Sequence, residues 1–175
     1  MHRTKKSSFN LIIILVPLVM VTAGGILLFK IIEKKQIVDS RENFIPIEIS
    51  LPGKRTDPIP ISIHNAPIII MYFEPDCYYC HIETEALLER IDEFSGIDIY
   101  LITANEWDEI EGFTAQYNLQ NYNRIVTGKI CRQDFYESYG ARVVPSLFIY
   151  DETGKLLYNS SGYTPVTVIL EALNR

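Results

Sequence analysis

The chain has 175 residues, of which 47% are hydrophobic, and a formal net charge of −6. Its charge is unevenly distributed: residues 1–35 carry 6 Lys/Arg and 1 acid, a net +5, whereas residues 36–175 carry 10 Lys/Arg and 21 acids, a net −11. An acidic segment without a basic stripe argues against nucleic acid as a partner. The acidic part, about 140 residues long, has the usual size of one domain with a single hydrophobic core.

The N-terminal part contains an uncharged run of 19 residues, from Leu11 to Phe29, behind a short basic tail. At about 1.5 Å per residue, such a run is long enough to cross the roughly 30 Å hydrocarbon core of a bilayer. A cleaved signal peptide is the alternative, because Val21-Thr22-Ala23 resembles a small-residue cleavage site. The apolar run continues past that site to Phe29, which favours an uncleaved signal anchor.

A basic N-terminal tail usually stays in the cytoplasm, which would place the rest of the chain outside the membrane. We therefore expect a cell-membrane protein with one span and an extracytoplasmic (periplasmic) C-terminal domain. The expected division is a cytoplasmic basic tail at 1–10, a transmembrane signal anchor at 11–32, a linker at 33–43 and a folded domain at 44–175.

Within the domain, apolar runs and helical periodicity alternate. Strands are expected at residues 44–49 and 59–63, around a turn-rich segment at 52–58, and then at 68–73, 97–102, near 124–126, 146–150 and 156–158. Helices are expected at 77–94, after an Asn105 cap, at 134–139 before Gly140, and from Thr164 as N-cap and Pro165 as first residue to Leu173. This order predicts an α/β sandwich with a mixed sheet.

The motif Cys77-Tyr78-Tyr79-Cys80 follows the apolar run of residues 68–73. A strand that delivers two cysteines, two residues apart, to the start of a helix is typical of a redox-active disulfide. A helix N-terminus favours the thiolate, so Cys77 is the expected attacking sulfur. Cys80 lies one turn further, on the apolar arc of the helix, and is the expected buried resolving sulfur.

Cysteine pairs of this spacing also occur in haem attachment and in zinc sites. Cys77-Tyr78-Tyr79-Cys80-His81 also matches the pattern for covalent attachment of c-type haem. Such a haem normally has a second axial Met or His ligand, and no Met or His follows His81 in this chain. A structural zinc site needs four ligands, which one cysteine pair and scattered histidines do not supply.

Glu83 falls on the same core-facing arc of the predicted helix as Cys80. Burial raises the pKa of a carboxyl group, which would suit Glu83 to exchange a proton with the thiols. The alternative is that its side chain reaches water at the helix edge.

Other residues near the motif suggest how the site is tuned. The acids Glu74, Asp76 and Glu85 surround Cys77 with negative charge, although Asp76 could also be a helix N-cap. Negative charge opposes the helix dipole and makes the disulfide less oxidising, which favours a reductase. We expect His81 to be a surface residue. Cys131 is expected to be a buried, inert thiol, with intermolecular pairing or redox sensing as the alternatives.

This arrangement, with Val144-Pro145-Ser146 just before the last hairpin, resembles the thioredoxin superfamily over residues 44–173. Together with the N-terminal anchor it resembles the membrane-anchored TlpA/ResA-like branch. The resemblance implies a thioredoxin-like fold with an additional strand and helix between Cys80 and Pro145, and a Cys77–Cys80 redox-active disulfide. It also implies a cis peptide bond before Pro145, with Val144 and Pro145 in the substrate groove, and a site-bordering acid at Glu83.

The implied activity is that of a thiol-disulfide oxidoreductase of the protein-disulfide reductase type, which needs no cofactor. Its expected partners are protein thiols and disulfides and a membrane electron donor; apocytochrome c reduction, a step of cytochrome c maturation, is one implied role. Tyr78 and Tyr79 could contact the substrate. The alternatives are a c-type haem electron carrier and a redox-inactive thioredoxin-like binding module. Peroxide reduction by one cysteine is disfavoured because its sequence context is absent.

The chain departs from the superfamily pattern at three places near the motif. Asp76 replaces the usual aromatic residue before the first cysteine, no proline lies between the cysteines, and Met71 stands where thioredoxin has a buried aspartate. These departures affect the identity of the partner more than the exchange chemistry.

Overall fold

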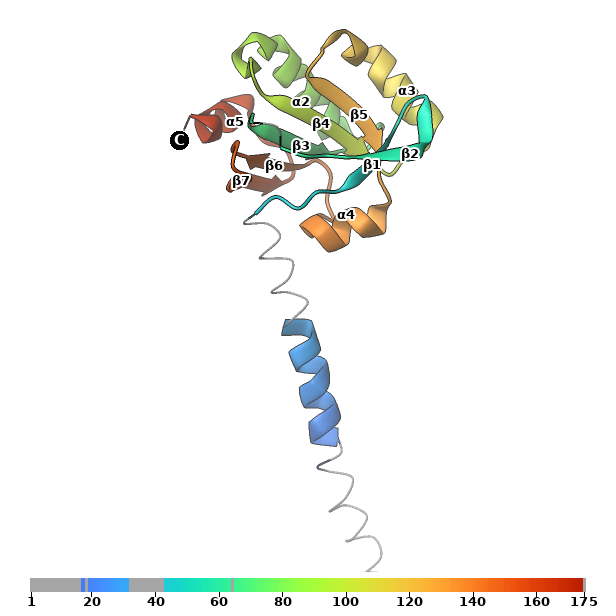
Figure 1. Cartoon of the computed structure of the whole chain (residues 1–175), viewed down its shortest axis with the longest axis vertical. Helices are drawn as coiled ribbons and strands as arrows, with labels where there is room; N and C mark the ends of the chain where they lie inside the picture. Colours follow the sequence, from blue (N-terminus) through green and yellow to red (C-terminus); the bar gives the residue numbers. More distant parts are fainter. Residues whose placement is uncertain (1–16, 18, 32–42, 64, 175) are drawn as a thin grey trace, which may run out of the picture. The chain divides into compact units, whose positions relative to one another are not determined.

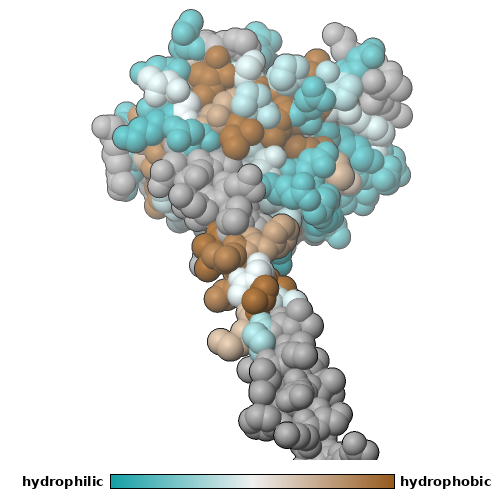
Figure 2. Space-filling model, turned by 60° about the horizontal axis from the view of Figure 1, so that its bottom comes forward, coloured by the Kyte–Doolittle hydropathy of each residue, from teal (hydrophilic) through white to brown (hydrophobic). Residues whose placement is uncertain are grey.

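The computed structural model describes residues 17, 19–31, 43–63 and 65–174, and divides the chain into units at residues 1–38 and 39–175. In the first unit residues 19–31 are helical, and their apolar side chains, Phe29 among them, are exposed. Figure 2 shows brown, hydrophobic side chains along this helix. Among the residues described here, no helix has both the length and the apolar character needed to cross a bilayer. Residues 11–16, 18 and 32 of the predicted anchor, and 33–42 of the linker, lie outside the described residues.

The second unit is built on a seven-stranded mixed sheet (Figure 1). The strand order is β2-β1-β5-β4-β3-β6-β7, with β3, β4 and β5 parallel and the remaining pairs antiparallel. This confirms the predicted mixed sheet. The strands are β1 (Glu48–Leu51), β2 (Lys54–Pro60), β3 (Ile68–Tyr72), β4 (Asp98–Thr103), β5 (Ile125–Lys129), β6 (Ser146–Tyr150) and β7 (Leu156–Ser161).

Helices flank the sheet on both faces. They are α2 (Tyr78–Glu89) with the 3-10 turn η1 (Ile91–Phe94), α3 (Trp107–Gln116) with η2 (Leu119–Asn121), α4 (Arg132–Tyr139) and α5 (Val166–Leu173). Gly140 ends α4 with a φ of 66°, the left-handed conformation expected of a C-terminal glycine. Two strands and two helices, β4, α3, β5 and α4, lie between Cys80 and Pro145, which accommodates the implied additional strand and helix.

The central strand β3 supplies side chains to two hydrophobic cores, one on each face of the sheet. Ile69 and Met71 belong to the core that α2, α3 and α5 cover. Ile68, Ile70 and Tyr72 belong to the core under α4. Because successive residues of a strand point to opposite faces, a strand covered on both sides is apolar throughout. The continuous apolar run predicted as a central strand is explained in this way.

Three predicted boundaries were wrong. The first hairpin turns at Pro52-Gly53, so that most of the segment predicted as a turn is strand β2. Its prolines are tolerated because β2 is the edge strand, whereas β1 pairs on both sides. Helix α3 begins after Glu106, which forms a capping box with Glu109, and not at Asn105. The N-cap of α5 is Pro165 and not Thr164. The Thr164 N–H donates to Glu83, and the Thr164 hydroxyl bonds that of Ser160.

Candidate active site

The first cysteine of the pair lies at the N-terminus of α2. Cys77 is the N-cap residue, and its Sγ accepts a hydrogen bond of 3.3 Å from the backbone N–H of Cys80. The turn that presents it is closed by the Cys77 N–H, which donates to the Glu74 carbonyl at 3.0 Å. Asp76 is exposed and does not cap the helix, so the alternative in which it is the N-cap is wrong. The thiol that faces the helix N-terminus is therefore the partly exposed one.

The second cysteine is fully buried, as predicted. Cys80 packs in the core with Phe73 and Leu87. Burial, the hydrogen bond with the Cys77 thiol and the nearby Glu83 carboxylate together raise the pKa of Cys80 well above its ordinary value. Cys80 is thus held as a thiol, and it needs a base before it can act as a nucleophile.

A carboxyl group lies buried one turn beyond Cys80. Glu83 is 1% exposed, so the alternative in which it reaches water is wrong. Its Oε2 accepts a hydrogen bond of 3.1 Å from the Thr164 backbone N–H, and its Oε1 is buried and has no hydrogen-bond partner among the described residues. Desolvation raises the pKa of Glu83 to about 7, opposed in part by the bond from Thr164. Glu83 can therefore gain and lose a proton near neutral pH.

The loop before β6 brings the implied substrate groove to the same end of the sheet. The Val144–Pro145 peptide bond is cis, as the resemblance implies. Ser146, the next residue, pairs with Tyr72 at the end of β3, which places Pro145 beside the turn that carries Cys77. The Pro145 carbonyl accepts a hydrogen bond of 2.7 Å from the Gly162 N–H.

Sequence reasoning missed the loop between β7 and α5, residues 162–165, as part of this site. The Gly162 N–H donates a hydrogen bond to the Pro145 carbonyl, and the Thr164 N–H donates one to the Glu83 carboxyl group. The loop therefore contacts both the groove and the buried acid. The Thr164 hydroxyl shares a hydrogen bond of 2.5 Å with Ser160 instead of capping α5. The only sequence feature that marks this loop is Thr164 before Pro165. That pair equally predicts the start of a helix, so it does not identify the loop as part of the site.

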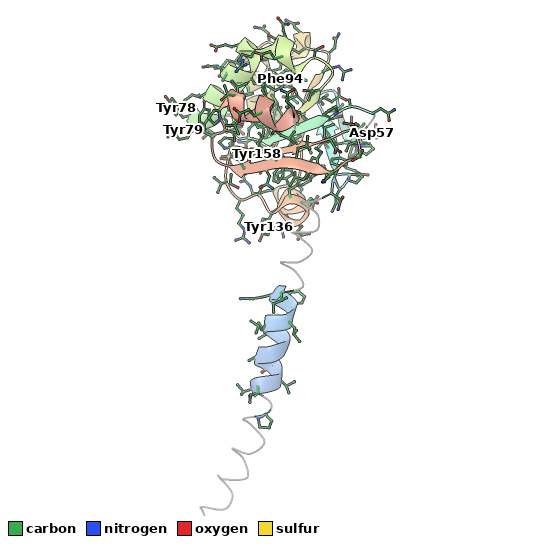
Figure 3. All side chains as sticks on the ribbon, turned by 90° about the vertical axis from the view of Figure 1, so that its left-hand side faces the viewer. Asp57, Tyr78, Tyr79, Phe94, Tyr136 and Tyr158 are labelled. Atoms are coloured by element: carbon green, nitrogen blue, oxygen red, sulfur yellow. The ribbon has the colours of Figure 1, made fainter. Side chains whose placement is uncertain are left out.

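Three tyrosines form an exposed aromatic surface beside Cys77. Tyr78, Tyr79 and Tyr163 are 71%, 56% and 42% exposed. The ring centroids of Tyr78 and Tyr79 are 5.4 Å apart, and those of Tyr79 and Tyr163 are 6.4 Å apart. Figure 3 shows Tyr78 and Tyr79 pointing outward at the edge of the domain.

One further prediction was wrong, that of a buried Cys131. Cys131 is exposed at the start of α4 and not buried, because the helix turns Phe135 and Tyr139 toward the core instead. His81 is only partly exposed: its Nδ1 lies 2.6 Å from the Tyr117 hydroxyl, which donates to Glu85 at 3.1 Å. Glu74 forms an ion pair of 2.9 Å with Arg132.

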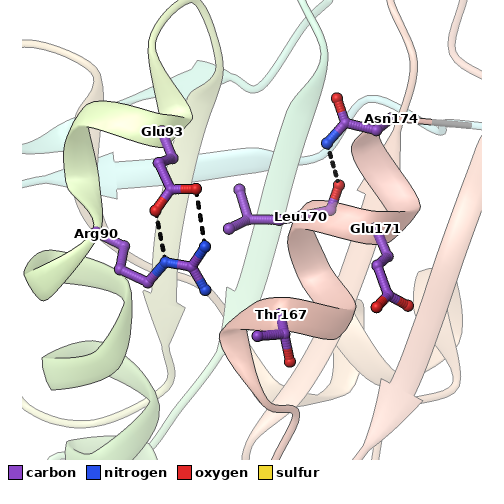
Figure 4. A pocket seen from close by; sticks show the side chains of 6 residues that line it. All are labelled: Arg90, Glu93, Thr167, Leu170, Glu171 and Asn174. Carbon is purple, nitrogen blue, oxygen red and sulfur yellow. Dashed lines mark hydrogen bonds and ion pairs between the residues drawn. The ribbon is translucent and has the colours of Figure 1, made fainter.

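A separate depression lies elsewhere in the domain. It has a volume of about 540 Å³ and is lined by residues of η1 and α5, together with Arg90 and Asn174 (Figure 4). Arg90 and Glu93 already pair with each other, and Asn174 donates to the Leu170 carbonyl. None of the predicted site residues lines this depression. Within the ranges that the structure describes, no group of three His, Cys, Asp or Glu side chains could hold a metal ion.

A mixed sheet with a cysteine pair at the start of the helix after its central strand, and a cis-proline at the same end, defines a thioredoxin-like fold. The sequence pattern of the thioredoxin-like domain matches residues 55–175. The chain therefore belongs to the thioredoxin-like domain family. No curated protein sequence matches it.

Solved structures share this fold at low sequence identity. StoA from Bacillus subtilis is 12% identical, with 74% of this chain and 96% of that chain covered and a TM-score of 0.56. A putative thiol:disulfide interchange protein DsbE from Chlorobium tepidum is 14% identical, with 76% and 91% covered and a TM-score of 0.61. The thioredoxin domain of a thiol-disulfide oxidoreductase from Bacteroides vulgatus is 15% identical, with 77% and 97% covered and a TM-score of 0.62.

Proposed function

We propose that this protein is a membrane-tethered, extracytoplasmic thiol-disulfide oxidoreductase that reduces protein disulfides with Cys77 and Cys80. The observation that carries the proposal is the asymmetry of the pair. The Cys77 sulfur accepts the Cys80 N–H at the N-terminus of α2, whereas Cys80 is fully buried one turn further. An accessible attacking sulfur beside a protected resolving sulfur is what a two-step disulfide exchange requires.

In the first step, the Cys77 thiolate attacks one sulfur of the substrate disulfide. The substrate S–S bond breaks, a mixed disulfide forms, and the other substrate sulfur leaves as a thiolate that takes a proton from water. In the second step, Cys80 gives its proton to the Glu83 carboxylate and attacks the Cys77 sulfur. The second substrate thiol is released, the substrate disulfide has gained two electrons, and Cys77 and Cys80 are left oxidised.

The direction of exchange follows from the charges near Cys77. Asp76 is exposed next to it, and the buried Glu83 carboxylate disfavours additional negative charge on the pair. Both groups make the dithiol form a better electron donor, which supports a reductase. Glu74 adds little to this effect because Arg132 neutralises it.

Tethering is proposed through residues 11–32, with the domain on the extracytoplasmic side and a membrane electron donor to regenerate the dithiol. The uncharged run from Leu11 to Phe29 behind a basic tail supports this arrangement. A tether raises the effective concentration of the domain at the membrane, where apocytochrome c is one substrate that would need reduced cysteines. Digestion of the domain by protease added to spheroplasts, with an intact N-terminus, would support this topology.

The aromatic surface of Tyr78, Tyr79 and Tyr163 supports a polypeptide as substrate, because exposed tyrosines beside a reactive group suit contact with a partner. We assign Val144 and Pro145 to the same groove, because Pro145 precedes the residue that pairs with Tyr72 at the end of β3. We expect Tyr79→Ala to raise the KM for a protein disulfide several-fold while the rate with a small disulfide stays unchanged.

The test of the proposed function combines turnover and trapping. Wild-type protein should catalyse insulin reduction by dithiothreitol, and Cys80→Ser should stop turnover but hold substrate proteins as mixed disulfides on Cys77. Cys77→Ser should abolish both. If the protein shows neither catalysis nor trapped species, the alternative of a redox-inactive binding module would be supported instead. A Soret absorption band in the purified protein would instead support the c-type haem carrier.

A further inference from the structure

A small cavity near the cysteine turn is lined by two arginines, two tyrosines, a glutamine and an alanine. It has a volume of about 290 Å³ and is separate from the residues that make up the cysteine pair and Glu83. We call it the arginine pocket. Its lining residues are Tyr72, Arg132, Gln133, Tyr136, Ala141 and Arg142.

A buried hydroxyl in this pocket has no partner. Tyr72 is 2% exposed, and its ring stacks on that of Phe135 at 4.6 Å. Its hydroxyl is buried and makes no hydrogen bond within the described part of the chain. A buried polar group without a partner has lost its hydrogen bonds to water without replacement, so an acceptor that enters the pocket would recover part of that cost. Burial raises the pKa of Tyr72, which keeps the hydroxyl protonated as a donor.

The charges around the pocket favour an anion. Arg132 is engaged with Glu74 at 2.9 Å. The Arg142 guanidinium lies over the Tyr136 ring, 4.1 Å from its centroid, and donates to the Tyr136 hydroxyl. Among the described residues no carboxylate pairs with Arg142. The lining side chains include two arginines and no carboxylate. The adjoining carboxylates are Glu74, paired with Arg132, and Glu137, which accepts a hydrogen bond of 2.6 Å from Gln133, so Arg142 is the lining cation that no carboxylate of the described residues neutralises.

The pocket lies on the α4 face of the sheet and is connected to the cysteine turn at two places. On one side Arg132 holds Glu74, whose carbonyl accepts the Cys77 N–H at 3.0 Å. On the other side Arg142 lies three residues before Pro145, and three residues span at most about 11 Å. A polypeptide whose sulfur is at Cys77 can therefore place a residue close to its own cysteine in the pocket.

We propose that the arginine pocket binds the carboxylate of an Asp or Glu side chain close to the reactive cysteine of the substrate polypeptide. The planar Arg142 guanidinium offers paired N–H donors to the two carboxylate oxygens, and the Tyr72 hydroxyl donates to one of them. The pocket thus selects polypeptide disulfides that carry an acidic neighbour. This specificity rests on the proposed function, because it assigns the pocket to the substrate of Cys77.

The kinetic test uses the full chain and short peptides with one cysteine in a mixed disulfide with nitrothiobenzoate. Glu is placed in turn at each of three positions on either side of the cysteine, and each peptide has a Gln counterpart. At one or more positions, wild type should release the chromophore about tenfold faster from the Glu peptide at low salt. Arg142→Gln should remove this preference by lowering the rate with the Glu peptide toward the rate with the Gln peptide. Arg90→Gln, an exposed arginine that does not line the pocket, should keep it.

A binding measurement separates the pocket from the redox chemistry. Fluorescent peptides with Ser in place of Cys are titrated with the Cys77→Ser/Cys80→Ser protein, which cannot exchange disulfides. The Glu peptide should bind about tenfold tighter than its Gln counterpart, Arg142→Gln should equalise them, and Tyr72→Phe should reduce the difference severalfold.

Equal affinities of the Cys77→Ser/Cys80→Ser protein for the Glu and Gln peptides at every position would overturn the proposal that the arginine pocket binds a substrate carboxylate. This conclusion would hold whatever the exchange rates. A preference that survives in Arg142→Gln would overturn it as well. Binding of free acetate without any preference among peptides would assign the pocket to small anions instead. Lack of exchange with every peptide, beside a retained binding preference, would reject the proposed function and keep the pocket.

Discussion

Glu83 accepts a hydrogen bond of 3.1 Å from the backbone N–H of Thr164, a residue 81 positions later in the chain. This bond satisfies one carboxylate oxygen and leaves the other, Oε1, buried without a partner among the described residues. The same loop bonds Pro145 through Gly162. The charge of one buried acid is therefore linked both to the resolving cysteine and to the loop that borders the groove.

The first prediction concerns stability against pH. The pKa of Glu83 is about 7 in the folded protein, above its ordinary 4.5, because burial disfavours the carboxylate. Its protonated form therefore contributes stability that is fully present below pH 4.5 and is lost as the pH rises through 7. The difference amounts to about 3 kcal/mol above both values.

Glu83→Gln cannot ionise, so it should escape this loss. Between pH 5 and pH 8, in steps of about one unit, the free energy of unfolding of the wild type should fall by about 2.5 kcal/mol relative to that of the variant. Urea denaturation of the reduced proteins measures both. Glu89→Gln, on the exposed side of α2, should follow the wild type. Parallel pH profiles for wild type and Glu83→Gln would contradict the raised pKa.

The second prediction concerns catalysis by the same carboxyl group. If Glu83 accepts the Cys80 proton, Glu83→Gln should slow turnover of a protein disulfide by about tenfold to a hundredfold. Formation of the mixed disulfide by Cys77 should change much less, because that step does not use the Cys80 proton. Stopped-flow measurement of the two steps separates them, with Glu89→Gln as the control. Equal slowing of both steps would assign Glu83 a structural role only.

The third prediction concerns the reactivity of the three thiols. Cys77 and Cys131 have exposed surface, whereas Cys80 has none. Iodoacetamide should therefore label Cys77 and Cys131 first, and Cys80 at least about tenfold more slowly, as mass spectrometry of peptides would show. Cys131→Ser should remove one fast label and leave turnover nearly unchanged. Abolished turnover in that variant would require a mechanism with three cysteines.

The fourth prediction concerns the approach of β1 to β5. A Cβ at Gly128 would lie 2.8 Å from Ile49 Cδ1 and 3.2 Å from the Ser50 carbonyl oxygen. Gly128→Ala should therefore lower the free energy of unfolding by about 1–3 kcal/mol, because either the side chain or the strand must move.

The matched control is Gly112→Ala in α3, where a Cβ meets no atom within 4 Å. Alanine is the better helix former, so this change should raise stability by about 0.5–1 kcal/mol. Thermal or urea unfolding of both variants gives the comparison. A Gly128→Ala protein as stable as wild type would show that β1 can move away from the added methyl group without loss of stability.

The sequence by itself determined the parts of the site that depend on local periodicity. The apolar run before Cys77 predicted the central strand, and the 3.6-residue repeat placed Cys80 and Glu83 on the buried arc of α2. Both predictions hold because a strand or a helix repeats at a fixed interval, so neighbouring residues alone decide which face a side chain occupies.

Only the tertiary structure decided which distant segments meet. It paired Glu83 with Thr164, exposed Cys131, and brought Tyr72 of β3 to Arg132 and Arg142. These contacts join residues from different elements, and no repeat in the sequence encodes them. The prolines around β1 and β2 show the same limit of sequence reasoning. Proline excludes a central strand, but which of the two strands lies at the edge of the sheet depends on the order of the strands in the folded protein.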